Sequence, residues 1–163
     1  MAYTPLFSEI LQKVGKLKTK KQKIDFLRQN NTPALRMVVK SSFDPNIIWV
    51  LPEGPVPFKP NDVPEGTEHT ILASEARKLY NFVKGGNGAL TKNKREMMFV
   101  QMLEGLHKDE ADIIVAAKDK SLHKVYKGLS AAVVKEAFNW DDNFMIKDDA
   151  SPKYEQYAQR ANV

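Results

Sequence analysis

The chain has 163 residues, of which 42% are apolar and none is cysteine, and it carries a formal net charge of +5 at neutral pH. This size suffices for one domain with a buried core, and the lack of cysteine excludes disulfides, thiolate nucleophiles and thiolate metal sites. No apolar stretch approaches the roughly 20 residues of a membrane-spanning helix, and the first residues lack a signal-peptide pattern. We therefore expect a soluble, intracellular protein with no membrane association.

Positive charge is concentrated in residues 1–40, which carry nine lysines and arginines against only Glu9 and Asp25. A basic end on an otherwise balanced domain is typical of a nucleic-acid binder. A solvated lysine-rich surface has the same composition. The charge by itself therefore leaves both interpretations open.

Apolar spacing in the first 50 residues predicts three helices. The first spans 5 to about 16, the second spans 20–29 after an N-cap at Thr19, and the third begins at Thr32 and Pro33. Five prolines and two glycines then make 51–68 an irregular strap, for which Val56, Phe58 and Val63 are the expected apolar anchors.

A helix over 70–84 ends at Gly85-Gly86-Asn87-Gly88, which is either a helix stop or an anion-binding nest of backbone N–H groups. Thr91 caps the next helix, whose first turn carries Lys92, Lys94 and Arg95. Cations there oppose the helix dipole. They either bind a ligand such as phosphate or are simply solvated.

A further helix begins near Lys108 with acids in its first turn, where they stabilise a helix. A basic hairpin from 118 to 130 and a helix over 131–138 follow. The sequence thus predicts an all-α fold, a compact bundle of about six to eight helices with an irregular strap at about 51–68. Residues 1–140 form the domain, and 141–163 form an acidic and polar tail with a short helix at 153–160.

Two segments carry a resemblance to a known family. The first runs from Ile10 through Thr19-Lys20-Lys21-Gln22-Lys23 to Asn30, and the second runs from Tyr126-Lys127-Gly128-Leu129-Ser130 to Phe138. They resemble the N-terminal helical DNA-binding domain of T4-type ATP-dependent DNA ligases. Most of the chain also resembles a family of small proteins carried by T4-like marine and cyanobacterial phages.

The ligase resemblance implies a helical bundle that contacts the sugar–phosphate backbone of duplex DNA without reading its sequence. A glycine in the hairpin would let the backbone approach a phosphate closely, and Ser130 would donate its hydroxyl to the same phosphate. Together with the basic helix starts, the expected DNA-binding residues are Lys18, Lys20, Lys21, Lys23, Lys92, Lys94, Arg95, Lys127, Gly128, Leu129 and Ser130.

The chain also departs from the ligase pattern. It has no K-x-D-G motif and no room for an adenylation domain, so ligase activity is excluded. It has no P-loop, and its three histidines are widely separated, so we expect no enzyme activity, no metal and no cofactor.

The resulting hypothesis is a non-catalytic accessory protein of phage replication, repair or transcription in the cytoplasm of the infected bacterial host. Its partners would be double-stranded DNA and a phage replication or transcription protein. The alternative is a protein-interaction module on the same fold, with the strap and Trp49, Phe58 and Trp140 forming a patch for a host or phage protein. Because the aromatic residues fall mostly at helical core positions, stacking of unpaired bases is disfavoured.

Overall fold

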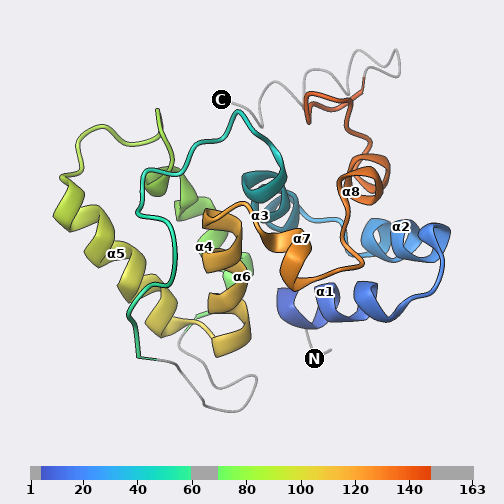
Figure 1. The fold of residues 1–163 in the computed structure, drawn as a ribbon, viewed down its shortest axis with the longest axis horizontal. Coiled ribbons are helices and arrows are strands. Elements are labelled where there is room, and N and C mark those ends of the chain that lie inside the picture. Colours follow the sequence, from blue (N-terminus) through green and yellow to red (C-terminus); the bar gives the residue numbers. More distant parts are fainter. Residues whose placement is uncertain (1–4, 60–69, 148–163) are drawn as a thin grey trace.

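The computed structural model describes residues 5–59 and 70–147, and these residues form a compact all-α fold (Figure 1). This confirms the predicted fold class. Within the described residues the helices are α1 (Phe7–Lys16), α2 (Lys20–Gln29), α3 (Pro33–Phe43), α4 (Leu72–Glu75), the 3-10 helix η1 (Ala76–Phe82), α5 (Lys92–Gly105), α6 (Lys108–Lys118), α7 (Leu122–Val125) and α8 (Ala131–Ala137).

Four helix starts follow directly from local sequence. The side-chain oxygens of the four N-cap residues each accept a hydrogen bond from the backbone N–H three residues later, and these caps are Thr19, Thr32, Thr91 and Ser130. A hydroxyl at this position satisfies an N–H that has no partner within its own helix. The short-range pattern therefore predicted these starts correctly.

Two expected elements differ from the structure. The helix expected over 70–84 is divided into α4 and η1 and ends at Phe82, because the chain then becomes extended and pairs with the segment around Trp49. Val50 N–H donates to the Phe82 carbonyl and Lys84 N–H donates to the Ile48 carbonyl. The stretch expected to be a hairpin over 118–130 contains the short helix α7.

Helix α6 is the centre of the bundle and contacts α1, α3, α5 and α7. Four of its apolar side chains are fully buried: Ala111, Ile113, Ile114 and Ala117. Its first turn also holds Glu110, which is buried. The sequence predicted that this carboxylate stabilises its own helix, but it reaches two others.

Glu110 joins the starts of two distant helices to α6. Its Oε2 atom accepts a hydrogen bond of 2.8 Å from the N–H of Phe7, the first residue of α1. Its Oε1 atom accepts one of 2.9 Å from the N–H of Leu72, the first residue of α4. Buried N–H groups at helix starts require an acceptor. One carboxylate supplies it for both helices.

The strap is described as far as Lys59, and there it lies on the helices as predicted. Leu51, Val56 and Phe58 pack against the core. The Nζ of Lys118, on a side chain that is only 1% exposed, donates to the carbonyls of Pro52 at 2.7 Å and Gly54 at 3.1 Å. A buried ammonium thus holds the strap by its backbone. The anchor expected at Val63 lies outside the described residues.

Residues 141–147 turn back onto the bundle. Trp140 pairs with Ile146 in an isolated antiparallel bridge, and the ring of Phe144 packs against the Trp140 ring at 6.1 Å between centroids. Both aromatic side chains are buried. The helix expected at 153–160 lies outside the described residues.

Replacing Glu110 with alanine leaves the N–H groups of Phe7 and Leu72 buried without this acceptor. We expect the free energy of unfolding to fall by about 2–5 kcal/mol, since each unpaired buried group costs about 1–3 kcal/mol. Urea denaturation followed by circular dichroism measures the change. The matched control is Asp112→Asn, which removes one exposed carboxylate from the same helix. Equal stability of the Glu110→Ala variant and the control would contradict this role.

Candidate nucleic-acid interface

The turn between α1 and α2 presents a dense group of lysines. Six of them lie between Lys13 and Lys23 with no acidic residue among them. All except Lys23, which is half-buried, are exposed: Lys13, Lys16, Lys18, Lys20 and Lys21. The turn is kept in shape by the capping box between Thr19 and Gln22. A rigid local backbone therefore displays these charges to solvent.

Most of these ammonium groups have no counter-ion within the protein. Lys20 lies 3.4 Å from a carboxylate oxygen of Glu136 on α8, and both side chains are more than half exposed. Exposed pairs of this kind are worth about 0–1 kcal/mol. Among the described residues, no carboxylate pairs with Lys16, Lys18, Lys21 or Lys23. These four lysines remain available for an external anion.

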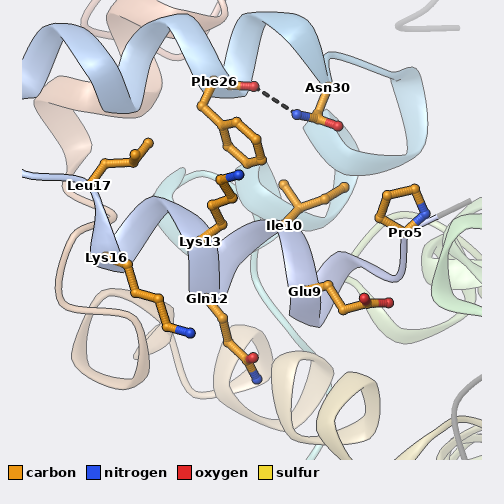
Figure 2. Close-up of a pocket in the computed structure, with 9 residues that line it drawn as sticks. All are labelled: Pro5, Glu9, Ile10, Gln12, Lys13, Lys16, Leu17, Phe26 and Asn30. Carbon is orange, nitrogen blue, oxygen red and sulfur yellow. Dashed lines mark hydrogen bonds between the residues drawn. The ribbon is translucent and has the colours of Figure 1, made fainter.

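A groove of about 730 Å³ lies beside this turn, along α1 and α2 (Figure 2). Its apolar lining includes Ile10, Leu17 and Phe26. Figure 2 shows Lys13 rising from α1 toward the Phe26 ring, with its Nζ atom 5.4 Å from the ring centroid. Lys16 also lines the groove. The groove thus adjoins the lysines of the turn, and its lining also includes the carboxylate of Glu9.

Lys13 and Lys16 were missing from the residues predicted from sequence. They were counted in the basic N-terminal segment, but in this part of the chain the prediction took only Lys18 and the lysines at the start of the second helix. The available signal was the acid-free run itself, which begins at Lys13 and extends to Lys23. Phe26, an apolar residue of α2, is half-buried and lines the groove.

The position of α2 is fixed by α8. The guanidinium of Arg28 donates to the carbonyls of Glu136 at 2.9 Å and Ala137 at 3.4 Å, near the C-terminal end of α8. A cation at this end of a helix is favourable, because the last carbonyls carry partial negative charge. Arg28 therefore has a structural role, and the lysines at the start of α2 project from a docked helix.

Gly128 and Leu129 of the hairpin have structural roles that the sequence did not reveal. A Cβ on Gly128 would lie 2.8 Å from the Gly15 Cα atom and 3.1 Å from the Val14 carbonyl oxygen, so this glycine permits close packing on α1. The Leu129 side chain is fully buried, so only the backbone of this residue could meet DNA. The Ser130 hydroxyl accepts the Val133 N–H as the cap of α8, and Lys127 is exposed.

Electrostatics also weaken the hairpin as an anion site. The pKa of Tyr126 is raised to about 12, first by burial and then by the negative charges of Asp109, Asp112 and Glu110 at the start of α6. Although Asp112 is exposed as a residue, partial desolvation of its carboxyl raises its pKa, with the charge of Lys108 opposing the shift and that of Asp109 adding to it. The hairpin therefore stands in the negative field of α6. The α1–α2 turn is the better candidate for a phosphate site.

The cations at the start of α5 lie elsewhere. Figure 1 places the beginning of α5 at the end of the long axis opposite the α1–α2 turn. Arg95 points inward: its Nε donates to the Asn81 carbonyl at 3.0 Å, and its Nη2 donates to the carbonyls of Asn87 and Leu90. It holds the glycine-rich loop together. Lys92 and Lys94 are exposed.

The aromatic patch of the alternative hypothesis is not exposed. Trp49 is 9% exposed and Trp140 is 4% exposed, and the Nε1–H of Trp49 donates to the Ser41 carbonyl within the protein. Phe58 is half-buried against the core. Buried aromatics of this kind are part of the core and do not form an interaction patch.

A protein-family model, described as "Family of unknown function (DUF6433)", matches residues 10–124, which is more than half of the chain. The chain belongs to this family. No curated protein and no solved structure matches the chain. The family segment contains the α1–α2 turn and the start of α5, and it ends before the 126–130 hairpin. The resemblance to ligase DNA-binding domains and to phage proteins stays a prediction.

Two further features bear on this family member. In the part of the chain that the structure describes, no three histidine or acidic side chains gather as a metal site would require. His107 instead caps α6, since its Nδ1 atom accepts the Asp109 N–H at 3.1 Å. The same described residues include no helix with the length and apolarity to cross a membrane.

Gly128 and Gly15 offer a matched pair of substitutions. Gly128→Ala forces its Cβ against the backbone of α1, so we expect a loss of about 1–3 kcal/mol in the free energy of unfolding. Gly15→Ala has open space at its Cβ, and within α1 it should stabilise the protein by roughly 0.5–1 kcal/mol. Thermal unfolding of both variants measures the two effects. A neutral Gly128→Ala would show that the hairpin glycine is not a packing requirement.

Proposed function

We propose that this protein is a non-catalytic, sequence-nonspecific binder of duplex DNA that contacts the phosphate backbone through the α1–α2 turn. The observation that carries the proposal is the acid-free run of six lysines from Lys13 to Lys23. Five of them are exposed, and all except Lys20 have no carboxylate counter-ion among the described residues. Neutralising successive phosphates and releasing their counter-ions supplies most of the affinity in binding of this kind.

The lysines at the start of α2 are electrostatically unfavourable for the free protein, and this supports an anionic ligand. Lys20, Lys21 and Lys23 lie in the first turn of α2, and this turn contains no acidic residue. Cations at a helix start oppose the dipole, whereas a bound phosphate there is favourable. A phosphate beside the turn would offset both the dipole term and the mutual repulsion of the lysines.

The role suggested by the ligase resemblance is an accessory one in DNA replication, repair or transcription. The groove adds Lys13 and Lys16 to the basic surface, so that phosphates on either side of the turn would meet lysine side chains. Backbone contacts position a protein on DNA without sequence discrimination. We therefore expect similar affinities for duplexes of unrelated sequence.

The test is replacement of Lys16, Lys18 and Lys21 together with glutamine, measured by fluorescence anisotropy with a labelled duplex at several salt concentrations. The parent protein should show a log–log dependence of affinity on salt with a negative slope. The triple variant should bind more weakly to all sequences, and the slope should shrink by up to about 2.7, since each phosphate contact contributes about 0.9.

The matched control changes the same charge on other surfaces: Lys59, Lys108 and Lys147, all exposed, replaced with glutamine. This variant should bind almost as the parent does, apart from a small loss from reduced overall charge. If both triple variants weakened binding equally, the α1–α2 turn would not be the site. If the parent bound no duplex even at low salt, the proposed function would be wrong.

A further inference from the structure

Positive charge is gathered in two separate runs of the chain. Residues 10–24 contain six lysines and no acid, and residues 76–95 contain six lysines and arginines and no acid. All other residues together contain thirteen lysines and arginines and twenty acids. Outside the two runs the chain is therefore acidic, and the net charge of +5 conceals a strong segregation.

The fold separates the two runs in space. Figure 1 shows the α1–α2 turn at one end of the longest axis and the loop from 83 to 91, with the start of α5, at the other end. We call these ends the first and second basic poles. The first pole is defined by the six lysines from Lys13 to Lys23. The second pole is defined by Lys84, Lys92 and Lys94, which are all exposed. The bundle centred on α6 lies between the poles.

The second pole is built on a fixed backbone. Arg95 ties the loop to the end of η1 through three carbonyl groups. Asn87 Nδ2 donates to Asn81 Oδ1 at 2.9 Å. Gly86 lies so close to the Tyr80 carbonyl that a Cβ would collide with it. The lysines of this pole thus project from an ordered loop and helix start.

The cations of the second pole also lack counter-ions. Among the described residues, no carboxylate pairs with Lys84, Lys92 or Lys94. The nearby Lys78 does pair with Glu75 on α4, at 2.9 Å, and Arg77 is exposed. The first turn of α5, like that of α2, has lysines and no acid. Both poles therefore share the chemistry expected of a phosphate-backbone site.

We propose that the protein bridges two segments of DNA, holding the backbone of one at each basic pole. This inference rests on the proposed function, because it assigns to the second pole the same ligand as to the first. A duplex bound at the first pole leaves the second at the far end of the molecule. The second pole is then free to take another polyanion.

A sandwich capture experiment tests bridging. A biotinylated duplex of about 20 bp is held on beads, a fluorescent duplex of the same length is in solution, and protein is added at about 50 mM salt, where phosphate contacts are strong. The parent protein should retain fluorescence on the beads. Retention should fall to background when the salt is raised. Duplexes this short limit wrapping of a single DNA around both poles.

Two charge-matched variants locate the sites. The first-pole variant replaces Lys16, Lys18 and Lys21 with glutamine, and the second-pole variant replaces Lys84, Lys92 and Lys94. Each should still bind one duplex in anisotropy but lose most of the capture, by about tenfold or more. The control replaces Lys59, Lys108 and Lys147 and should capture almost as the parent does. A mixture of the two pole variants should not restore capture if both sites must lie on one molecule.

The outcomes separate the two proposals. Anisotropy binding without capture would overturn bridging and leave the proposed function standing. Capture that persists in the second-pole variant would mean that self-associated protein joins the duplexes through the first pole, and it would also overturn this inference. Absence of any binding by the parent would overturn both proposals. Circular dichroism of each variant shows whether a loss of capture merely reflects unfolding.

Discussion

The buried carboxyl of Glu110 is the constraint on which the arrangement of the helices depends. It accepts backbone N–H groups from α1 and α4, which lie 103 and 38 residues away in sequence. An interior helix start needs an acceptor that its own helix cannot supply. Since α6 also contacts α3, α5 and α7, this carboxyl fixes the basic N-terminal helices relative to the rest of the bundle.

The fold class and several helix starts could be predicted because they depend on neighbouring residues. At any helix start, the side chain of an N-cap threonine lies close to the backbone N–H three residues later. The N-caps at Thr19, Thr32 and Thr91 could therefore be predicted from sequence. The contacts that join helices were not readable. Lys118 holds the strap 64 and 66 residues away, and Lys120 donates to the carbonyls of Ser41 and Asp44. Nothing local distinguishes these lysines from solvated ones.

The same limit applies to the candidate site. Lys20, Lys21 and Lys23 were expected from the ligase resemblance, and the structure places them beside Lys18 where α1 turns into α2. Arg95 carries the same charge, yet its guanidinium donates to the carbonyl of Asn81 at the end of η1 and to two carbonyls of the glycine-rich loop. The path of that loop places these carbonyls beside Arg95. Gly128 gives a second example. A glycine was expected here because it lets the backbone approach a phosphate, but in the structure it lets the backbone approach α1. The residue type alone does not identify the group that a residue contacts in the folded protein.

The stability of the fold does not explain why positive charge is gathered at two poles. Like charges gathered within one run repel one another, and they would be more stable interspersed with the twenty acids of the chain. Internal ion pairs do use some lysines, such as Lys118 with Asp119 and Lys78 with Glu75. Apart from Lys20, which lies beside the exposed Glu136 carboxylate, the lysines of the two poles form no ion pair among the described residues. A surface that keeps unneutralised cations at helix starts, against the helix dipole, is most simply explained by an anion outside the protein.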